Sequence, residues 1–240
     1  MEFDPIEATG PFHSQGYRKI WTGLRFAGIR TSKRRILRLT RVHGLQAPGR
    51  VGRPRGPKAH DGTIRTGRGR PDVGQRPDLD PNRRAAGLDL HSGRTTASAG
   101  CVGIDAAGRA TRFEALEPIR QAVRACLGGF AGGIANGLEL RHDHGSQFVA
   151  DDFQRELAFL GIVPSPAFVR EPEGNGCAER FIRTLKENLL WVRRFTSIEE
   201  LRQALHAFKD AYNRTWIIER HGYRTPAQVR ADQRGLAQAA

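Results

Sequence analysis

Residues 27–112 contain no Phe, Tyr or Trp, and this gap constrains the fold more than any other feature of the sequence. Within it, residues 61–100 hold seven Gly, seven Arg and five Asp but only five large apolar residues. These apolar residues follow neither the two-residue alternation of a strand nor the period of a helix. Such a segment cannot build a core by itself. The main apolar core must therefore come from the residues after 100.

Basic residues are concentrated near the N-terminal end of the chain. The 240 residues include 39 Lys and Arg against 25 Asp and Glu, a net charge of +14. Residues 1–60 hold 13 Lys and Arg against 3 Asp and Glu, whereas residues 101–240 hold 19 against 17. This excess points to a polyanionic partner. Three widely spaced cysteines and the lack of a long apolar run predict a cytoplasmic protein without membrane contact.

Two short amphipathic helices are expected within residues 16–44. Gly28 is the stop signal for the first helix, and Thr31 or Ser32 can cap the second. Apolar side chains share one face of each helix: Tyr17, Ile20, Trp21, Leu24 and Ala27 in the first, and Ile36, Leu39 and Val42 in the second. The other face of the second helix is basic and carries Arg34, Arg38 and Arg41. This pattern is typical of a DNA-binding helix-turn-helix, and a basic helix that is only solvated is the alternative.

From Cys101 onward, strand patterns alternate with helix patterns, which is typical of an α/β layer domain. Strands are expected at residues 101–104, 138–143 and 162–165. Helices are expected over 113–129, starting properly near Pro118, from a cap at Asp151 or Asp152 to a stop at Gly161, over 175–191, and from a capping box of Ser197 and Glu200. The first of these helices should bury Phe113, Leu116, Ile119, Val123 and Leu127. The expected organisation is a helix-turn-helix (1–45), a basic linker (46–66), an irregular segment (67–99), an α/β core (100–228) and a tail (229–240).

Two carboxylates occupy positions that would suit a metal site. Asp143 ends a strand beside a glycine turn, where α/β sheets present functional groups, and Glu179 lies in the first turns of the helix over 175–191. Together with a third carboxylate they could hold two hard cations, which can activate a water or a 3′-hydroxyl for attack on a phosphodiester. Glu179, Arg183 and Lys186 share one helical face. The structural alternative is that Asp143 caps a turn and Glu179 pairs with Arg183.

The residues around these carboxylates resemble the catalytic core of bacterial insertion-sequence transposases related to retroviral integrases. The similar motifs are HDHGSQF (142–148), LGIVPS (160–165), EPEGNGCAERFIRTLKE (171–187) and YNRTWIIERHGYRTPAQ (212–228). The resemblance implies a ribonuclease H-like fold with an Asp-Asp-Glu triad. Its last two members correspond to Asp143 and Glu179, with 35 residues between them, and the basic residue seven positions later corresponds to Lys186. Residues 16–45 are similar to the helix-turn-helix that precedes this core.

By resemblance, the reaction is metal-dependent cleavage and transfer of DNA strands at insertion-sequence ends. Asp143 and Glu179 would bind Mg²⁺ or Mn²⁺, and Arg180, Arg183 and Lys186 would contact DNA. Double-stranded DNA, as transposon ends and target, is the expected partner, with a homo-oligomer on the DNA in the bacterial cytoplasm. Two other functions stay open: a DNA-binding remnant without catalysis, and a ribonuclease H-like nuclease. Joining of a DNA end to a target would distinguish the first function from both.

The histidines that flank Asp143 are not expected to be metal ligands. His142 and His144 alternate with Asp143 along a strand and therefore face away from it. We interpret them as structural or as neighbours of the substrate.

The first Asp of the triad is not recognisable in this sequence. The family places it after a Trp, in a pattern like Trp-x-x-Asp-x-Thr, yet no Trp occurs between Trp21 and Trp191. Asp105 is expected to begin a turn after the wrong strand. The other candidates lie in a segment without a strand pattern: Asp72, Asp78, Asp80 and Asp89. We therefore expect a core that is incomplete at its first strands, and a copy with little or no strand-transfer activity.

A shifted reading frame would explain the missing Asp. Residues 72–79 are compatible with the codons GAT GTG GGG CAG CGA CCT GAC CTN, which read Met-Trp-Gly-Ser-Asp-Leu-Thr one nucleotide further on. The recovered Asp straddles Arg76 and Pro77, and Arg76 lies 67 positions before Asp143. Residues 89–93 can likewise be recoded to Thr-Phe-Ile-Ala-Val, a strand-like run. We therefore expect roughly residues 67–99 to be translated out of frame.

Overall fold

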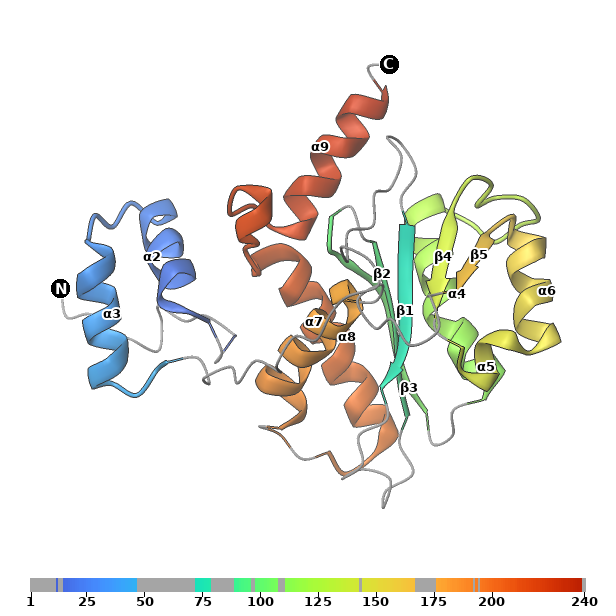
Figure 1. Cartoon of the computed structure of the whole chain (residues 1–240), viewed down its shortest axis with the longest axis horizontal. Helices are drawn as coiled ribbons and strands as arrows, with labels where there is room; N and C mark the ends of the chain where they lie inside the picture. Colours follow the sequence, from blue (N-terminus) through green and yellow to red (C-terminus); the bar gives the residue numbers. More distant parts are fainter. Residues whose placement is uncertain are drawn as a thin grey trace, which may run out of the picture.

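A five-stranded mixed sheet forms the centre of the core, with helices on both faces (Figure 1). This computed structural model describes residues 12, 15–46, 72–78, 89–95, 98–107, 111–142, 144–166, 176–191, 193 and 195–238. The strands are β1 (Asp72–Asp78), β2 (Asp89–Thr95), β3 (Cys101–Ala107), β4 (Glu139–His142) and β5 (Val163–Pro166). Their order is β3-β2-β1-β4-β5. The β1–β2 and β2–β3 pairs are antiparallel, and the β1–β4 and β4–β5 pairs are parallel.

The helices divide between the two faces of the sheet and a separate N-terminal pair (Figure 1). The N-terminal pair is α2 (Tyr17–Phe26) and α3 (Lys33–Val42). One face of the sheet is covered by α4 (Arg112–Leu127), α5 (Ser146–Val149) and α6 (Asp151–Leu160). The other is covered by α7 (Gly176–Leu185), its π-helical continuation η3 (Lys186–Leu190) and α8 (Ile198–Thr215), followed by η4 (Glu219–His221) and α9 (Pro226–Gln238). No helix in the described part of the chain is long and apolar enough to span a membrane.

The expectation that the sheet is short of its first strands is wrong, because β1 and β2 fill the two positions between β3 and β4. Both strands lie within the segment 67–99, for which the residue pattern indicated no regular structure. The physical reason is that sheet hydrogen bonds join backbone groups, which every residue except proline can supply in full. A segment of the right length can therefore continue a sheet even where its side chains show no strand alternation.

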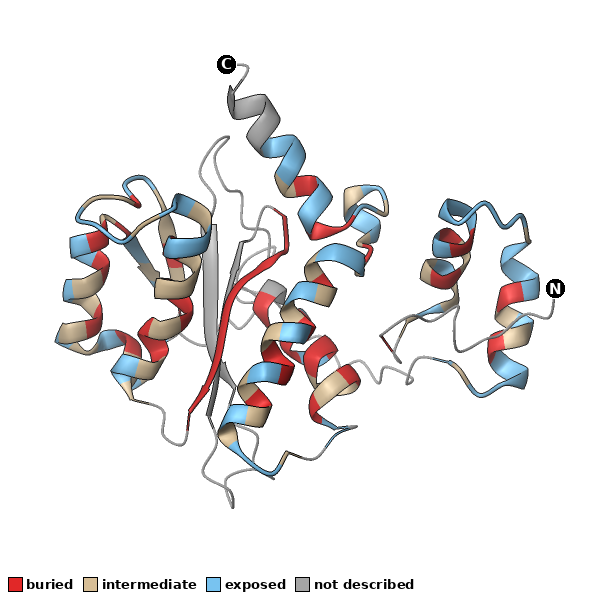
Figure 2. Cartoon of the chain, turned by 180° about the vertical axis from the view of Figure 1, so that it is seen from behind, coloured by how far each residue is buried: buried red, intermediate tan, exposed pale blue. Residues whose placement is uncertain are grey.

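β3 lies at one edge of the sheet and is nevertheless buried along its whole length (Figure 2). Side chains satisfy part of its outer edge. Asn213 of α8 accepts a hydrogen bond from the Cys101 N–H at 2.9 Å and donates one to the Cys101 carbonyl at 2.7 Å. Gln121 of α4 accepts from the Ile104 N–H at 3.1 Å. These amides take the place of a further strand and protect the edge from pairing with other chains.

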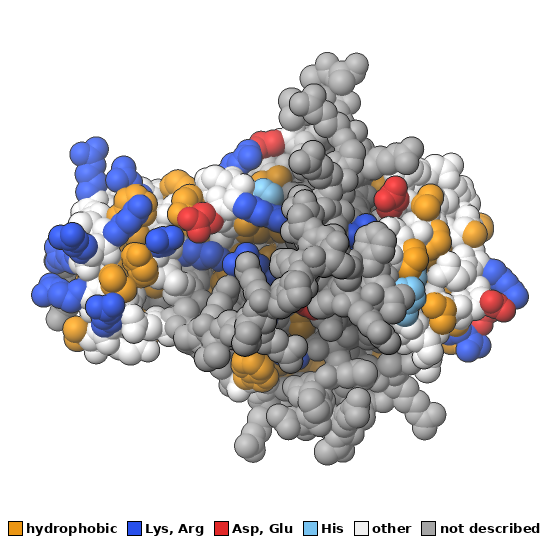
Figure 3. Space-filling view, viewed as in Figure 1, with side chains coloured by type: hydrophobic (Ala, Val, Ile, Leu, Met, Phe, Trp, Pro, Cys, Tyr) orange, Lys and Arg blue, Asp and Glu red, His pale blue; other side chains and the backbone are white. Residues whose placement is uncertain are grey.

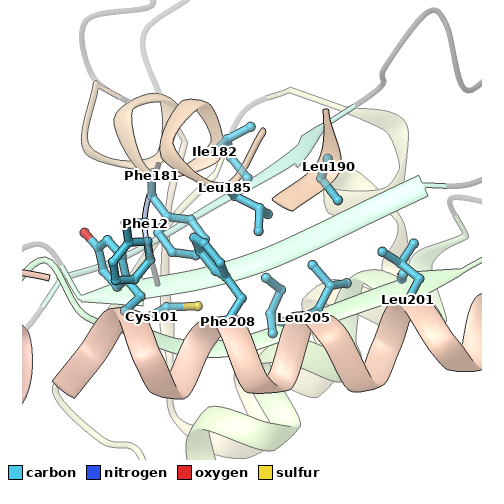
Figure 4. Packing of buried hydrophobic residues seen from close by; sticks show 12 residues of the cluster. Phe12, Cys101, Phe181, Ile182, Leu185, Leu190, Leu201, Leu205 and Phe208 are labelled. Atoms are coloured by element: carbon cyan, nitrogen blue, oxygen red, sulfur yellow. The ribbon is translucent and has the colours of Figure 1, made fainter. Parts of the chain in front are cut away.

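A core of buried apolar side chains lies between the sheet, α7 and α8 (Figure 4). Phe181 of α7 meets Tyr212 of α8 edge to face, with ring centroids 5.0 Å apart. Leu185 and Leu205 are also fully buried in this cluster. On the opposite face, a second cluster joins α4, α5 and α6 to β4 through Leu116, Leu140, Phe148, Phe153 and Leu157. Each face of the sheet therefore has its own core, as expected for an α/β layer domain.

α4 differs from its expected form at its start and in the burial of two of its side chains. It begins at Arg112 with Thr111 as N-cap, six residues before Pro118. Phe113 and Leu127, which we expected to be buried, are 51% and 40% exposed. Pro118 lies inside the helix, and its carbonyl is so close to Gly103 of β3 that a Cβ at Gly103 would overlap it. The backbones of α4 and β3 therefore pack directly against each other.

Other helices follow their sequence patterns closely. α6 buries Phe153, Leu157 and Leu160 and ends at Gly161, whose φ of +78° lies in the left-handed region that favours glycine. α8 begins after Ser197, whose Oγ accepts a hydrogen bond from the Glu200 N–H at 3.1 Å. The expected buried face and end of α6 and the expected cap of α8 are confirmed. The expectation that Asp151 or Asp152 caps α6 is wrong, because Ala150 is the N-cap and both aspartates lie in the first turn of the helix.

The N-terminal helices α2 and α3 form a small unit around three buried side chains. Ile20 and Leu24 of α2 pack against Ile36 of α3. Trp21 Nε1 donates to the Thr31 carbonyl at 2.8 Å, and Ser32 caps α3 by accepting from the Arg35 N–H. Val42, expected on the buried face of the second helix, is 74% exposed because α3 extends beyond its contact with α2.

An aromatic side chain, Phe12, connects the N-terminal region to the core. Phe12 is buried, and its ring packs edge to face against Phe208 at 5.6 Å and Trp216 at 4.9 Å. Lys19 Nζ lies 3.3 Å from the centroid of the Trp216 ring, in a cation–π contact. The helical pair thus meets the core near the C-terminal end of α8.

Candidate active site and nucleic-acid interface

The expected site lies where β4 ends and α7 begins. β4 ends at His142, so Asp143 is the next residue in the sequence but lies outside the described residues. β1 pairs with β4 in parallel, with Asp72 opposite Glu139 and Gly74 opposite Arg141. α7 in turn contacts β1. β1 therefore lies between the strand that leads to Asp143 and the helix that carries Glu179.

Glu179 lies in the first turn of α7 and is partly buried. Arg180 and Arg183 are exposed on the same helix, and Lys186 is partly buried at its end. Arg183 Nε lies 2.7 Å from Glu187 Oε1, so Arg183 forms an ion pair with Glu187. The expected spacing of Glu179, Arg183 and Lys186 is thus present within one helical segment.

A π-helical turn follows α7, which the sequence pattern did not indicate. Asn188 is buried and donates from Nδ2 to the Thr184 carbonyl at 2.7 Å, four residues earlier. The Trp191 N–H bonds to the Lys186 carbonyl, five residues earlier. An Asn inside a helix with a Thr four residues before it is a weak signal for such a distortion, because both side chains compete for backbone groups. The turn leaves Trp191 62% exposed at the end of the helix.

The two histidines beside Asp143 occupy different environments. His142 is buried, and its ring lies 5.6 Å from that of Phe148 and 6.2 Å from that of Phe153. His144 is exposed. The placement of His142 among aromatic rings supports a structural role for that residue.

Asp105 does not begin a turn, as the sequence suggested, but lies within β3. It is buried, and Arg202 of α8 donates from Nε to its carboxylate at 3.1 Å. Burial raises the pKa of Asp105 above the ordinary aspartate value, and the nearby Arg202 guanidinium opposes part of this shift. Asp105 therefore joins β3 to α8 and is not available as a metal ligand.

The described residues do not fit a two-metal site. Among them, no three His, Cys, Asp or Glu side chains are grouped closely enough to hold a metal ion. Of the other candidates for the first Asp, Asp72 and Asp78 lie at the two ends of β1 and Asp89 begins β2, while Asp80 lies outside the described residues. The interior of β1, residues 73–77, contains no carboxylate.

Exposed cations form a row along α3. Arg34, Arg38 and Arg41 are all exposed, at positions i, i+4 and i+7 of the helix. Ile36 and Thr40 are buried, toward α2. Figure 3 shows Lys and Arg side chains gathered over this end of the molecule, with few acidic side chains among them. A helix face of this kind suits the phosphates of a nucleic acid.

Sequence comparisons connect the second half of the core to known proteins. Residues 160–226 match the family model described as Integrase core domain. The InsD proteins of insertion elements IS2E and IS2A/D/F/H/I/K from Escherichia coli are 28% and 27% identical to this chain over 95 residues. These matches cover 38% of this chain and 42% and 30% of the two relatives. The chain thus spans less than half the length of the curated relatives it matches.

Solved structures with the same fold include retroviral integrases. The catalytic core domain of BIV integrase matches with a TM-score of 0.51 at 16% identity, covering 70% of this chain and 97% of that domain. A chain of the simian T-cell lymphotropic virus intasome, solved with PP2A regulatory subunit B56 gamma, matches with a TM-score of 0.53 at 19% identity. That match covers 87% of this chain and 69% of the other.

The resemblance to transposases with an integrase core is confirmed. The ribonuclease H-like integrase fold expected from the motifs is also the fold of this chain. Within this integrase core, Glu179 falls inside the matched segment 160–226 and Asp143 lies before it.

Proposed function

We propose that this chain functions in DNA transposition, as a DNA-binding protein of the transposase and integrase class. The main support is the position of Glu179. It begins a helix inside the segment that matches the integrase core family, and the exposed Arg180 and Arg183 follow it on that helix. The E. coli relatives are transposases, which supports a bacterial cytoplasmic setting and double-stranded DNA, as element ends and target, for the partner. Assembly of more than one copy on the DNA belongs to the same proposal.

Two surfaces are proposed to contact the DNA. The first is the row of Arg34, Arg38 and Arg41 on α3, which has the spacing of a helix that lies along phosphates. The second is the start of α7, with Arg180, Arg183 and Lys186. The contacts of Phe12 and Lys19 with Trp216 favour a fixed placement of the first surface relative to the core.

Strand transfer is not assigned to the chain as it stands. In this class the reaction uses Mg²⁺ or Mn²⁺ held by three carboxylates, and this chain offers Asp143 and Glu179 without a third in the interior of β1. A non-catalytic occupant of transposon ends is therefore the form of the proposal that these residues favour. A ribonuclease H-like nuclease is the second candidate, but it would need the same missing carboxylate.

Salt titration of DNA binding tests the proposal. We expect the affinity of the full chain for duplex DNA to fall steeply with salt. Replacing Arg34, Arg38 and Arg41 together with Ala should lower the affinity and reduce the log–log slope by about one unit for each phosphate that is no longer neutralised. A control variant removes the same charge elsewhere, by replacing Arg112, Arg124 and Arg155 of α4 and α6 with Ala. Equal affinity and slope in the two variants would exclude the α3 surface.

A further inference from the structure

β1 and β2 occupy the interior of the sheet, where strands are normally apolar. Each has a neighbouring strand on both sides, and α4 and α7 contact β2 and β1 respectively. Their own sequences do not suit this position, because DVGQRPD and DLHSGRT contain one large apolar residue each. The adjacent β3, by contrast, reads CVGIDAA and is buried throughout. Since burying unpaired charged groups is costly, position and sequence disagree in both strands.

Pro77 adds a second disagreement. It pairs with His91 in the β1–β2 ladder, one residue before the end of a strand that lies between β2 and β4 in the sheet order, although the β1–β4 register itself ends at Gly74. Proline has no backbone N–H to donate and is normally restricted to edge strands, strand starts and bulges. Natural selection for a well-packed sheet would not produce this sequence in an interior strand.

A reading frame shifted by one nucleotide would remove both disagreements. Codons compatible with residues 72–78, the bounds of β1, can be read in that frame as Met-Trp-Gly-Ser-Asp-Leu-Thr. Codons compatible with residues 89–93, the first five residues of β2, can be read as Thr-Phe-Ile-Ala-Val. Neither of these runs contains proline, and both are richer than the translated strands in the aromatic, β-branched and other apolar residues that interior strands need.

The register between β1 and β4 indicates which residue of β1 corresponds to the missing metal ligand. Every residue pair in this register is separated by 67 residues, from Asp72 with Glu139 to Gly74 with Arg141. Arg76 and Asp143 are separated by the same 67 residues. We propose that the gene carries compensating frameshifts on either side of β1 and β2, and that Arg76 occupies the chain position at which the shifted frame encodes a third metal-binding carboxylate. This inference rests on the proposed function, because only an integrase-type core needs that third carboxylate.

A shifted frame explains why the interior of β1, residues 73–77, carries no carboxylate. In place of three carboxylates, the chain as translated has Asp143, Glu179 and a permanently positive arginine. A cation at the third position repels Mg²⁺ or Mn²⁺ instead of binding it. The same shift leaves two interior strands with polar sequences, so the chain has lost packing as well as a ligand.

The nucleotide sequence that encodes residues 72–95 is the first test. We expect codons that, read one nucleotide further on, give Trp at position 73, Asp at position 76 and the apolar run over 89–93. Codons that cannot give these residues in the shifted frame would overturn the inference.

A chain with both strands restored is the second test. In the full-length protein, residues 72–78 and 89–93 are replaced by the shifted-frame residues, a change that includes Arg76→Asp. The matched control carries the same replacements except for Arg76→Asn, which keeps the shape and removes the charge. Urea unfolding should show both restored chains to be more stable than the original. Calorimetry should show Mn²⁺ binding about tenfold or more tighter with Arg76→Asp than with Arg76→Asn.

The outcomes separate this inference from the proposed function. Equal Mn²⁺ affinity in the two restored chains, or no gain in stability, would overturn the inference even if DNA binding stayed intact. Selective Mn²⁺ binding by the chain with Arg76→Asp, together with no affinity for DNA, would support the inference and contradict the proposed function.

Discussion

At the scale of single residues, Gly103 shows how closely α4 and β3 approach. A Cβ at this position would overlap the carbonyl of Pro118, which belongs to a helix backbone and cannot move aside alone. We therefore expect Gly103→Ala to lower the free energy of unfolding by about 2–4 kcal/mol, since α4 must shift away from the sheet. Urea denaturation followed by circular dichroism would measure this change.

A second glycine is a matched control for Gly103. Gly23 lies in α2, and a Cβ at this position would have nothing within 4 Å, so Gly23→Ala should be neutral or stabilising by about 0.5–1 kcal/mol. If both variants had the midpoint of the original chain, the direct packing of α4 on β3 would be contradicted.

The buried Asp105 should make stability depend on pH. Burial raises the pKa of its carboxyl in the folded chain, so the folded state binds more protons than the unfolded state. This difference begins near the ordinary aspartate pKa and extends upward from there. The stability of the chain relative to Asp105→Asn should therefore fall as the pH rises through that window. Urea unfolding of both proteins between about pH 3.5 and 7 tests the sign, and a relative stability that rises with pH would contradict it.

At the scale of elements, local signals decided which helices could be predicted. α6 and α8 have regular apolar periods and clear ends, and both were expected from the sequence. The start of α4 was missed because Pro118 resembled a first-turn proline. A better signal was present, since Thr111 and Glu114 have the spacing of a capping box, and the Thr111 hydroxyl bonds to the Glu114 carboxylate. The π-helical turn has only a weak local signal, the pair of Thr184 and the buried Asn188.

The N-cap of α8 is suited to a stability test at this scale. Ser197 Oγ accepts from the Glu200 N–H, and the Glu200 carboxylate accepts from the Thr196 N–H at 2.8 Å. Ser197→Ala should lower the free energy of unfolding by about 1 kcal/mol, because a backbone donor at the helix start loses its partner. Ser197→Asp, which retains an acceptor, should stay close to the original chain. Thermal unfolding of the two variants would check this, and equal losses would argue against the cap.

At the scale of the whole molecule, the fold was predictable from residue 101 onward, and the earlier part was not. The motifs and the strand–helix alternation indicated the integrase core, whose match covers residues 160–226. β1 and β2 could not be predicted, because their residues carry no strand pattern and only the neighbouring strands define their places. The insertion of Phe12 beside Phe208 and Trp216 joins residues about 200 positions apart, a contact that no local pattern indicates.

The candidate site was only partly predictable for the same reason. The sequence alone shows the spacing between Asp143 and Glu179 and the basic residues Arg180, Arg183 and Lys186 that follow Glu179. The structure places Glu179 in the first turn of α7, as expected. The relation of Arg76 to Asp143 needed the register of β1 on β4, which only the folded chain provides. A residue pattern can thus indicate that a ligand is missing, while the sheet indicates where it belongs.

We propose that this chain binds DNA as an integrase-fold protein but does not join DNA strands. A strand-transfer assay tests it most directly, with the purified full-length chain, duplexes taken from both flanks of its gene, a target plasmid, and Mg²⁺ or Mn²⁺. We predict that the chain retains the duplexes in a gel-shift measurement and yields no joined product with either metal. A joined product that requires the metal and is lost in Glu179→Gln would contradict the claim.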